Sequence, residues 1–318
     1  MNTASWSSLS DQLVVAEDLF GATRGRELLG TWLDEQKERV DSPTFGNEFA
    51  QHVSLPGMQA IDYCHRYLRT RWGNALGGIR FFRRDVTRPF IEVIAHSFDD
   101  LDQLRGAVSA EWAAFEPQFL RLRTRPGRIA GPHVHLDVTI HAAHYQAMSR
   151  HSSTVSLEPF DSVDDAIAMV QRRFDDLKIS QPQLYRNVTQ ANADDLREGH
   201  EAGQLMAIVA ARRQVGLLAV SPGSIEWIEG DVINEEIVTA AASGHGYAAA
   251  AQTAWAASQH RSPTTHLIGT IDHLNVASRK SAQRAGRPSI LEEVFIQLPH
   301  EPPCLRGRQL HAKAPPLT

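Results

Sequence analysis

The chain is poor in the features that mark secreted, membrane-spanning or nucleic-acid-binding proteins. It has two cysteines in 318 residues, Cys64 and Cys304, too few for a disulfide framework. No apolar run approaches the roughly twenty residues needed to cross a bilayer, and the first residues lack the basic segment and apolar core of a signal peptide. The net charge of −5 gives no broad basic surface. We therefore expect a cytoplasmic protein that binds neither membranes nor nucleic acids.

Composition and length point to a globular protein of more than one domain. A hydrophobic content of 42% with 22% charged residues is enough to build buried cores. A chain of 318 residues is long for one domain, so we expect two. The last twenty residues contain five prolines and are expected to be a poorly ordered tail.

The most informative stretch is a glycine turn between a strand and a helix. An apolar strand over residues 231–239 leads into Ser243-Gly244-His245-Gly246, and an alanine-rich helix begins at Tyr247. A helix start exposes unpaired backbone N–H groups at the positive end of the helix dipole, and glycines allow a ligand to approach them closely. The turn therefore predicts a binding site for phosphate or pyrophosphate.

A second motif follows the first. A strand over residues 267–271 ends at Asp272 and is followed by a helix that starts near Asn275 and is closed by Gly286. The order of strand, glycine turn, helix, strand and Asn-capped helix resembles that of the Gcn5-related N-acetyltransferase (GNAT) family. The resemblance covers roughly residues 160–298.

The resemblance implies an α/β (α+β) fold, a mixed and mostly antiparallel sheet flanked by helices, and an acyl-CoA site. The family's pyrophosphate loop falls on residues 241–246, where Ala241 replaces the usual cation or amide, and its Asn-x-x-Ser motif falls on Asn275 and Ser278. The tyrosine that often protonates the leaving thiolate is replaced by Ala282, with Arg287 where an aromatic residue often sits. The residues implied to bind acetyl-CoA, or another short acyl-CoA, are Glu236, Ile237, Val238, Ala242, Ser243, Gly244, His245, Gly246, Tyr247, Asn275 and Ser278.

The first half of the chain repeats a coarse version of the same pattern without the glycine turn. Paired strands are predicted at residues 78–83 and 90–96, followed by a helix over 99–115 and a strand over 118–123. We therefore predict two tandem GNAT-like domains: a degenerate copy at residues 1–150, an acyl-CoA-binding domain at 151–300 and a tail at 301–318. The segment 221–224, Ser-Pro-Gly-Ser, is predicted to be a turn between two strands.

Acyl transfer to an amine needs a base for the amine, a donor to the thioester carbonyl and an acid for the departing thiolate. Glu235 and Glu236 lie on opposite faces of the strand at 231–239, and a carboxylate in an apolar strand is either paired or functional. We assign the base to Glu236, with an ion pair as its structural alternative. Ser281, next to the vacant tyrosine position, or water is the acid.

The predicted function is N-acylation of a small-molecule amine by direct attack on the acyl-CoA in a ternary complex. An alternative is a regulatory protein that binds CoA without turnover, favoured by Ala241 and Ala282. A further alternative is a metal-assisted enzyme: His133, His135 and Asp137 share one face of a predicted strand, and His141 and His144 would lie one turn apart on a helix. With fifteen histidines in the chain, chance clustering is the simpler explanation, so no metal is assigned.

Overall fold

The computed structural model describes residues 6–150, 154–258, 262 and 264–299. Its strands form one eleven-stranded sheet in the order β1-β2-β3-β4-β11-β5-β10-β9-β8-β7-β6, mostly antiparallel and flanked by helices. The α/β class predicted from the sequence is confirmed. Cys304 and residues 300–318 of the predicted tail lie outside the described residues. No helix in the described part of the chain combines the length and the apolar character needed to cross a membrane.

The described residues of the first half form strands β1 to β5 and helices α1 to α4. The strands are β1 Arg66–Arg69, β2 Asn74–Phe81, β3 Pro89–His96, β4 Phe119–Thr124 and β5 Val134–His144, and the helices are α1 Ser10–Phe20, α2 Ala22–Glu38, α3 Pro43–His52 and α4 Leu101–Glu111. One core cluster joins α3 and α4 to one face of these strands, and a second joins α1 and α2 to the other face.

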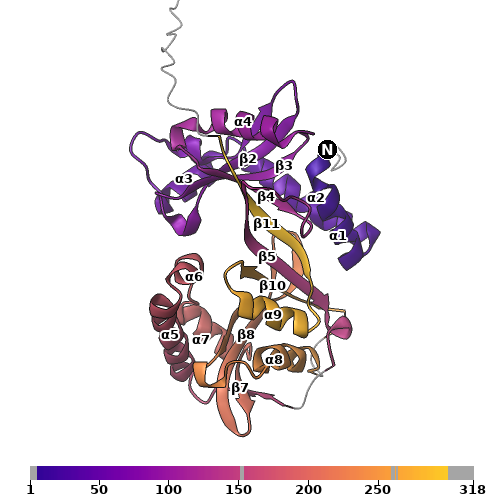
Figure 1. Cartoon of the computed structure of the whole chain (residues 1–318), viewed down its shortest axis with the longest axis vertical. Helices are drawn as coiled ribbons and strands as arrows, with labels where there is room; N and C mark the ends of the chain where they lie inside the picture. The colour runs from indigo at the N-terminus through magenta and orange to yellow at the C-terminus, as the bar shows by residue number, and fades with distance from the viewer. Residues whose placement is uncertain (1–5, 151–153, 259–261, 263, 300–318) are drawn as a thin grey trace, which may run out of the picture.

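The described residues of the second half form strands β6 to β11 and helices α5 to α9. The strands are β6 Ser156–Pro159, β7 Leu205–Ala210, β8 Arg213–Ile225, β9 Ile228–Val238, β10 His266–Asp272 and β11 Ser289–Gln297, and the helices are α5 Val163–Ser180, α6 Pro182–Asn187, α7 Ala193–Glu201, α8 Tyr247–Ala256 and α9 Val276–Arg284. Helices α5 and α7 cover one face, and α8 packs on the other (Figure 1).

The turn predicted at residues 221–224 is wrong. Strand β8 continues through these residues to Ile225, where Pro222 pairs with Asp231 and Gly223 with Gly230, so β8 and β9 form one long hairpin. The chain reverses at Glu226, which takes a left-handed φ of 56°. A proline is accepted in β8 because the end of this hairpin extends beyond β7, whose pairing with β8 stops at Ala219.

The two halves exchange their last strands. Strand β11 from the end of the chain lies between β4 and β5, and β5 lies between β11 and β10. These two long strands cross from one half of the molecule to the other in Figure 1. The core reflects the exchange: Val294 and Ile296 of β11 pack with α4 of the first half, whereas Leu291 shares a cluster with residues of both halves.

Each half also contains the same local unit. Strand β3 pairs in parallel with β4 only from Phe90 to Glu92, and a register shift in its pairing with β2 makes Ile94 an extra residue. Strand β9 pairs in parallel with β10 at Asp231 and Val232, and the corresponding shift makes Asn234 the extra residue. In both copies a β-bulge therefore follows two residues after the parallel pairing ends.

Candidate functional site

A cleft of about 1500 Å³ lies where β9 and β10 diverge. Beyond Val232, no residue of β9 pairs with β10 in the described part of the chain. Thr239 donates its backbone N–H to Val215 of β8, 2.9 Å away. Because backbone groups of an antiparallel strand alternate in direction, those of Glu236 and Val238 point away from β8 and into the gap. The backbone groups of Glu236 and Val238 thus line one wall of the cleft, where the Glu236 N–H also contacts the Glu235 carboxylate.

The glycine turn closes one end of the cleft. Gly244 and Gly246 have φ of 84° and 78°, a left-handed conformation that favours glycine, and α8 begins directly after Gly246. The first hydrogen bond of α8 runs from Ala250 N–H to Gly246 O, at 3.0 Å. Among the described residues, none accepts a hydrogen bond from the backbone N–H groups of residues 244–249. Unpaired donors at a helix start are the geometry that the predicted anion site requires, and the binding of an anion there stays a prediction.

All but one of the sequence-predicted site residues line this cleft. Those that do are Glu236, Ile237, Val238, Ala242, Ser243, Gly244, Gly246, Tyr247, Asn275, Ser278 and Ser281. His245 does not: its ring contacts the carbonyl oxygens of Ala242 and Ser243 and stacks on the ring of Tyr247, with the two ring centroids 5.4 Å apart. Its side chain stabilises the turn, and only its backbone N–H remains for a ligand.

The start of α9 forms the wall opposite the glycine turn. The Asn275 side-chain oxygen caps α9 by accepting from Ser278 N–H at 3.2 Å. Ala282, at the position of the missing tyrosine, is fully buried, and its carbonyl accepts from Arg287 N–H at 2.9 Å. The same wall continues with Ser281 and with two cationic residues, Lys280 and Arg284, which add positive charge to the cleft.

Glu235 and Glu236 lie on opposite faces of β9, in different environments. The Glu236 carboxylate accepts two hydrogen bonds from Gln252 Nε2 of α8, at 2.9 and 3.0 Å. The Glu235 carboxylate, on the face covered by α5 and α7, accepts from Ala191 N–H at 3.4 Å. Burial raises the pKa of both, and that of Glu235 rises to about 7. Glu235 is therefore poised to exchange a proton near neutral pH.

Residues of the first half complete the cleft, and sequence reasoning did not assign them to the site. Arg121 of β4 and Asp137 of β5 line it beside Phe82. Arg121 pairs with Glu92, with Asp137 at 3.1 Å and with Glu293 at 2.8 Å. Burial raises the pKa of Asp137 to about 6, an effect that Arg121 opposes. One signal in the sequence pointed to Arg121: the strand segment at residues 119–123 is otherwise apolar but carries arginines at alternate positions, 121 and 123.

The five residues proposed as metal ligands do not form a metal site in the described part of the chain. His133 directly precedes strand β5, and the other four residues belong to that strand. The helical spacing proposed for His141 and His144 is therefore wrong. On a strand, these two side chains point to opposite faces of the sheet. Each ring has its own contact: His133 with Gln297, His135 with Phe119, His141 with the Arg287 carbonyl and His144 with the Thr264 carbonyl.

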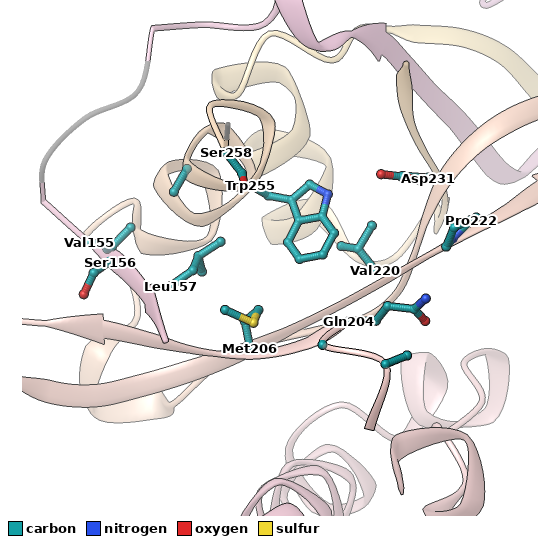
Figure 2. A pocket seen from close by; sticks show the side chains of 13 residues that line it. Val155, Ser156, Leu157, Gln204, Met206, Val220, Pro222, Asp231, Trp255 and Ser258 are labelled. Carbon is teal, nitrogen blue, oxygen red and sulfur yellow. The ribbon is translucent and has the colours of Figure 1, made fainter. Parts of the chain in front are cut away.

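A second, smaller pocket of about 510 Å³ lies between α8 and the sheet, away from the glycine turn. Figure 2 shows its lining, with Trp255 of α8 and Asp231 of β9 on one side and Met206 on the other. Tyr145 joins the two by donating to Asp231 and accepting from Trp255 Nε1. These polar groups hold α8 on the sheet, and we assign the pocket no chemistry.

Among the described residues of the first half, the helix that follows the bulge does not offer the same free donors. After its bulge, β3 leads through Phe98 into α4, which is capped by Asp100 with Asp102 in its first turn. Carboxylates there occupy the helix start and repel phosphate. The N-terminal segment covers this region, since Ser8 Oγ accepts from His96 N–H at 2.7 Å and Trp6 is buried.

No protein-family model and no curated protein matches the chain. Solved structures give similarities of fold at low sequence identity. A GNAT-family acetyltransferase from Colwellia psychrerythraea is 12% identical, over 85% of this chain and 97% of that one, with a TM-score of 0.48. A GCN5-related N-acetyltransferase from Sphaerobacter thermophilus is 10% identical, over 82% and 90%, with a TM-score of 0.47. A tandem GNAT protein from the clavulanic acid biosynthesis pathway is 12% identical, over 87% and 96%, with a TM-score of 0.39.

Proposed function

We propose that the chain is an acyl-CoA-dependent N-acyltransferase of the tandem GNAT type, acting on a small-molecule amine. The observation that carries the proposal is the combination of a diverging strand pair with a free helix start at its end. The N–H groups of residues 244–249 would hold the pyrophosphate, and the Glu236 and Val238 backbone groups would pair with the pantetheine amides. Bound CoA would supply the activated acyl group. The residues present fit such a cofactor along the whole cleft.

The cleft also supports an amine as the acceptor. Glu235 and Asp272 line it and can accept hydrogen bonds from an amine, whereas Asp137 is already paired with Arg121. Glu235 is the better-placed base of the two glutamates, because its carboxylate accepts from backbone N–H groups rather than from a side-chain amide and its pKa is about 7. Glu236, proposed as the base from the sequence, is held by Gln252 on the other face of β9. We therefore propose Glu235 as the base and keep Glu236 as the alternative.

In the proposed reaction, the amine loses a proton to Glu235, directly or through water, and its lone pair attacks the thioester carbonyl. The C–S bond then breaks as the attacking nitrogen gives up its second proton, and a proton reaches the departing thiolate by relay through Ser281 or water, since Ala282 offers none. The products are the amide and free CoA.

Two measurements test the proposal in sequence. Isothermal titration of the full chain should show that CoA and acetyl-CoA bind; the absence of binding at millimolar CoA would overturn the assignment. A panel of amines with acetyl-CoA, followed by thiol release, then separates an enzyme from a CoA-binding regulatory protein. The burial of Ala282 is the observation that favours the regulatory alternative. Binding without thiol release across the panel would support it.

A further inference from the structure

Arg287 places a buried guanidinium at the inner end of the cleft. Its side chain is 2% exposed, yet it lines the cavity. Its Nε donates to Gln252 Oε1 at 3.0 Å, but Nη1 is buried and has no hydrogen-bond partner within the described residues. Burial lowers the pKa of Arg287 to about 10, so the group remains charged at neutral pH. A buried cationic N–H without an acceptor is unfavourable, so a ligand atom is expected to supply one.

The surrounding backbone fixes the position of Arg287. Gly286 ends α9 with a φ of 84°, and a Cβ there would lie 2.6 Å from Ser149 N. The Arg287 carbonyl contacts His141 Nδ1 at 3.0 Å. Gln252 is held at both ends, by Glu236 through its amide nitrogen and by Arg287 through its oxygen. The guanidinium is therefore preorganised rather than free to swing out into solvent.

Nη1 lies where β9 and β10 begin to diverge. Gly269 is the first residue of β10 after its pairing with β9 ends. A Cβ built on Gly269 would lie 3.4 Å from Nη1 and 3.8 Å from the Cβ of Ile233. No side-chain atom of residue 269 therefore stands between Nη1 and the innermost point of the gap.

We propose that Arg287 selects an acyl group that carries a second oxygen, as succinyl and acetoacetyl groups do. The inference rests on the proposed function and adds to it that the acyl chain extends from the thioester toward Gly269. The methyl group of acetyl offers no acceptor and leaves Nη1 unpaired, and so does a plain alkyl chain. A terminal carboxylate or ketone accepts from Nη1 in a charge-assisted hydrogen bond. Arg287 then acts as a specificity-determining residue for the acyl donor.

The test compares four-carbon acyl groups by isothermal titration of the full chain, with free CoA as the reference. Succinyl-CoA should bind about tenfold or more tightly than butyryl-CoA, the scale of one charge-assisted hydrogen bond. Acetoacetyl-CoA shows whether a ketone oxygen is sufficient or a carboxylate is required. Butyryl-CoA binding as tightly as both oxygen-bearing thioesters would overturn the inference. If free CoA and all thioesters fail to bind, it is the proposed function that fails.

Two variants locate the effect. Arg287→Met keeps most of the side-chain length but removes the donor, and should bring the succinyl-to-butyryl ratio close to one. Gly269→Ala keeps the guanidinium but fills the space in front of Nη1 without a clash, because its new contacts begin at 3.4 Å. It should reduce the ratio in the same way, so the inference stays testable if Arg287→Met does not fold. Free CoA measures the integrity of the cofactor site in each variant. A ratio unchanged in Gly269→Ala would mean that the acyl chain does not reach Arg287.

Discussion

Ile94 of β3 and Asn234 of β9 are the extra residues of two equivalent β-bulges. Each stands two residues after the end of a parallel strand pairing, in β3–β4 and β9–β10 respectively. The repeat of this offset indicates a common architecture for the two halves. They differ after the bulge, where the first copy leads to an aspartate-capped helix and the second to the glycine turn. The architecture is thus duplicated, but the anion site is not.

The first prediction is that each chain binds one CoA, through the second copy only. Gly246→Val should abolish binding measured by isothermal titration, because a β-branched residue disfavours the left-handed φ of 78° at this position. Gly106→Ala in α4 is the control, since a Cβ there meets no atom within 4 Å and CoA affinity should be unchanged. A stoichiometry of two, or binding that survives Gly246→Val, would contradict the prediction.

Much of the fold could be predicted from periodicity and turn chemistry. The strand predicted at residues 118–123 became β4, and the strand at 267–271 became β10, each within a few residues. The exchange of β5 and β11 could not be predicted, because strand pairing between distant segments leaves no local signal in one sequence. The domain boundaries proposed near residues 150 and 300 stay predictions. Strands from both sides of the first boundary belong to one sheet.

The site was predictable where function depends on backbone geometry and less so where it depends on side-chain neighbours. Glycines at 244 and 246 indicate their own conformation, so the turn could be found by inspection. The hydrogen-bond partners of Glu235 and Glu236 come from the segment before α7 and from α8 respectively. The sequence does not reveal how these two segments pack on β9. Arg121 and Asp137 reach the cleft only because β4 and β5 join the same sheet as β10.

The second prediction separates the roles of the two glutamates. With an amine acceptor in hand, Glu235→Gln should lower kcat by roughly 10²–10⁴-fold and remove the rise in rate as pH passes through about 7. Glu236→Gln is the matched variant and should affect kcat less, because it replaces a carboxylate already paired with Gln252. CoA titration checks that both variants keep the cofactor site. The reverse order of effects would assign the base to Glu236.

The third prediction concerns stability and does not require a substrate. Burial raises the pKa of Glu235 from 4.5 to about 7 in the folded protein. Between these values the folded state holds a proton that the unfolded state has released, so the contribution of Glu235 to the free energy of unfolding decreases as pH rises. Glu235→Gln cannot ionise, and its stability relative to wild type should increase from pH 4.5 to 7 and then level off. Urea unfolding across this range measures the difference, and a difference independent of pH would contradict the raised pKa.

The fourth prediction tests the ion-pair network between the halves. Arg121→Met leaves Glu92, Asp137 and Glu293 without their shared cation, and should destabilise the protein by about 3–5 kcal/mol at neutral pH. The deficit should shrink in acid, where the carboxylates protonate and no longer need the guanidinium. Arg197→Met, which breaks an exposed pair with Asp194, is the control and should cost less than about 1 kcal/mol. Equal effects of the two variants in urea unfolding would show that the network is not a buried one.

The last prediction follows from the strand exchange. Leu291 of β11 is fully buried in a cluster that contains Leu76 of the first half and Ile268 of the second. Leu291→Ala should lower the free energy of unfolding by about 2–5 kcal/mol, the usual cost of such a cavity. Because one sheet contains both halves, the loss should appear as a shift of a single unfolding transition, seen alike by tryptophan fluorescence and circular dichroism. Val86→Ala, at a side chain that is 40% exposed, is the control and should shift the midpoint little. Two separate transitions in the wild type, with only one displaced by Leu291→Ala, would mean that the halves unfold independently and that the exchanged strands do not couple them.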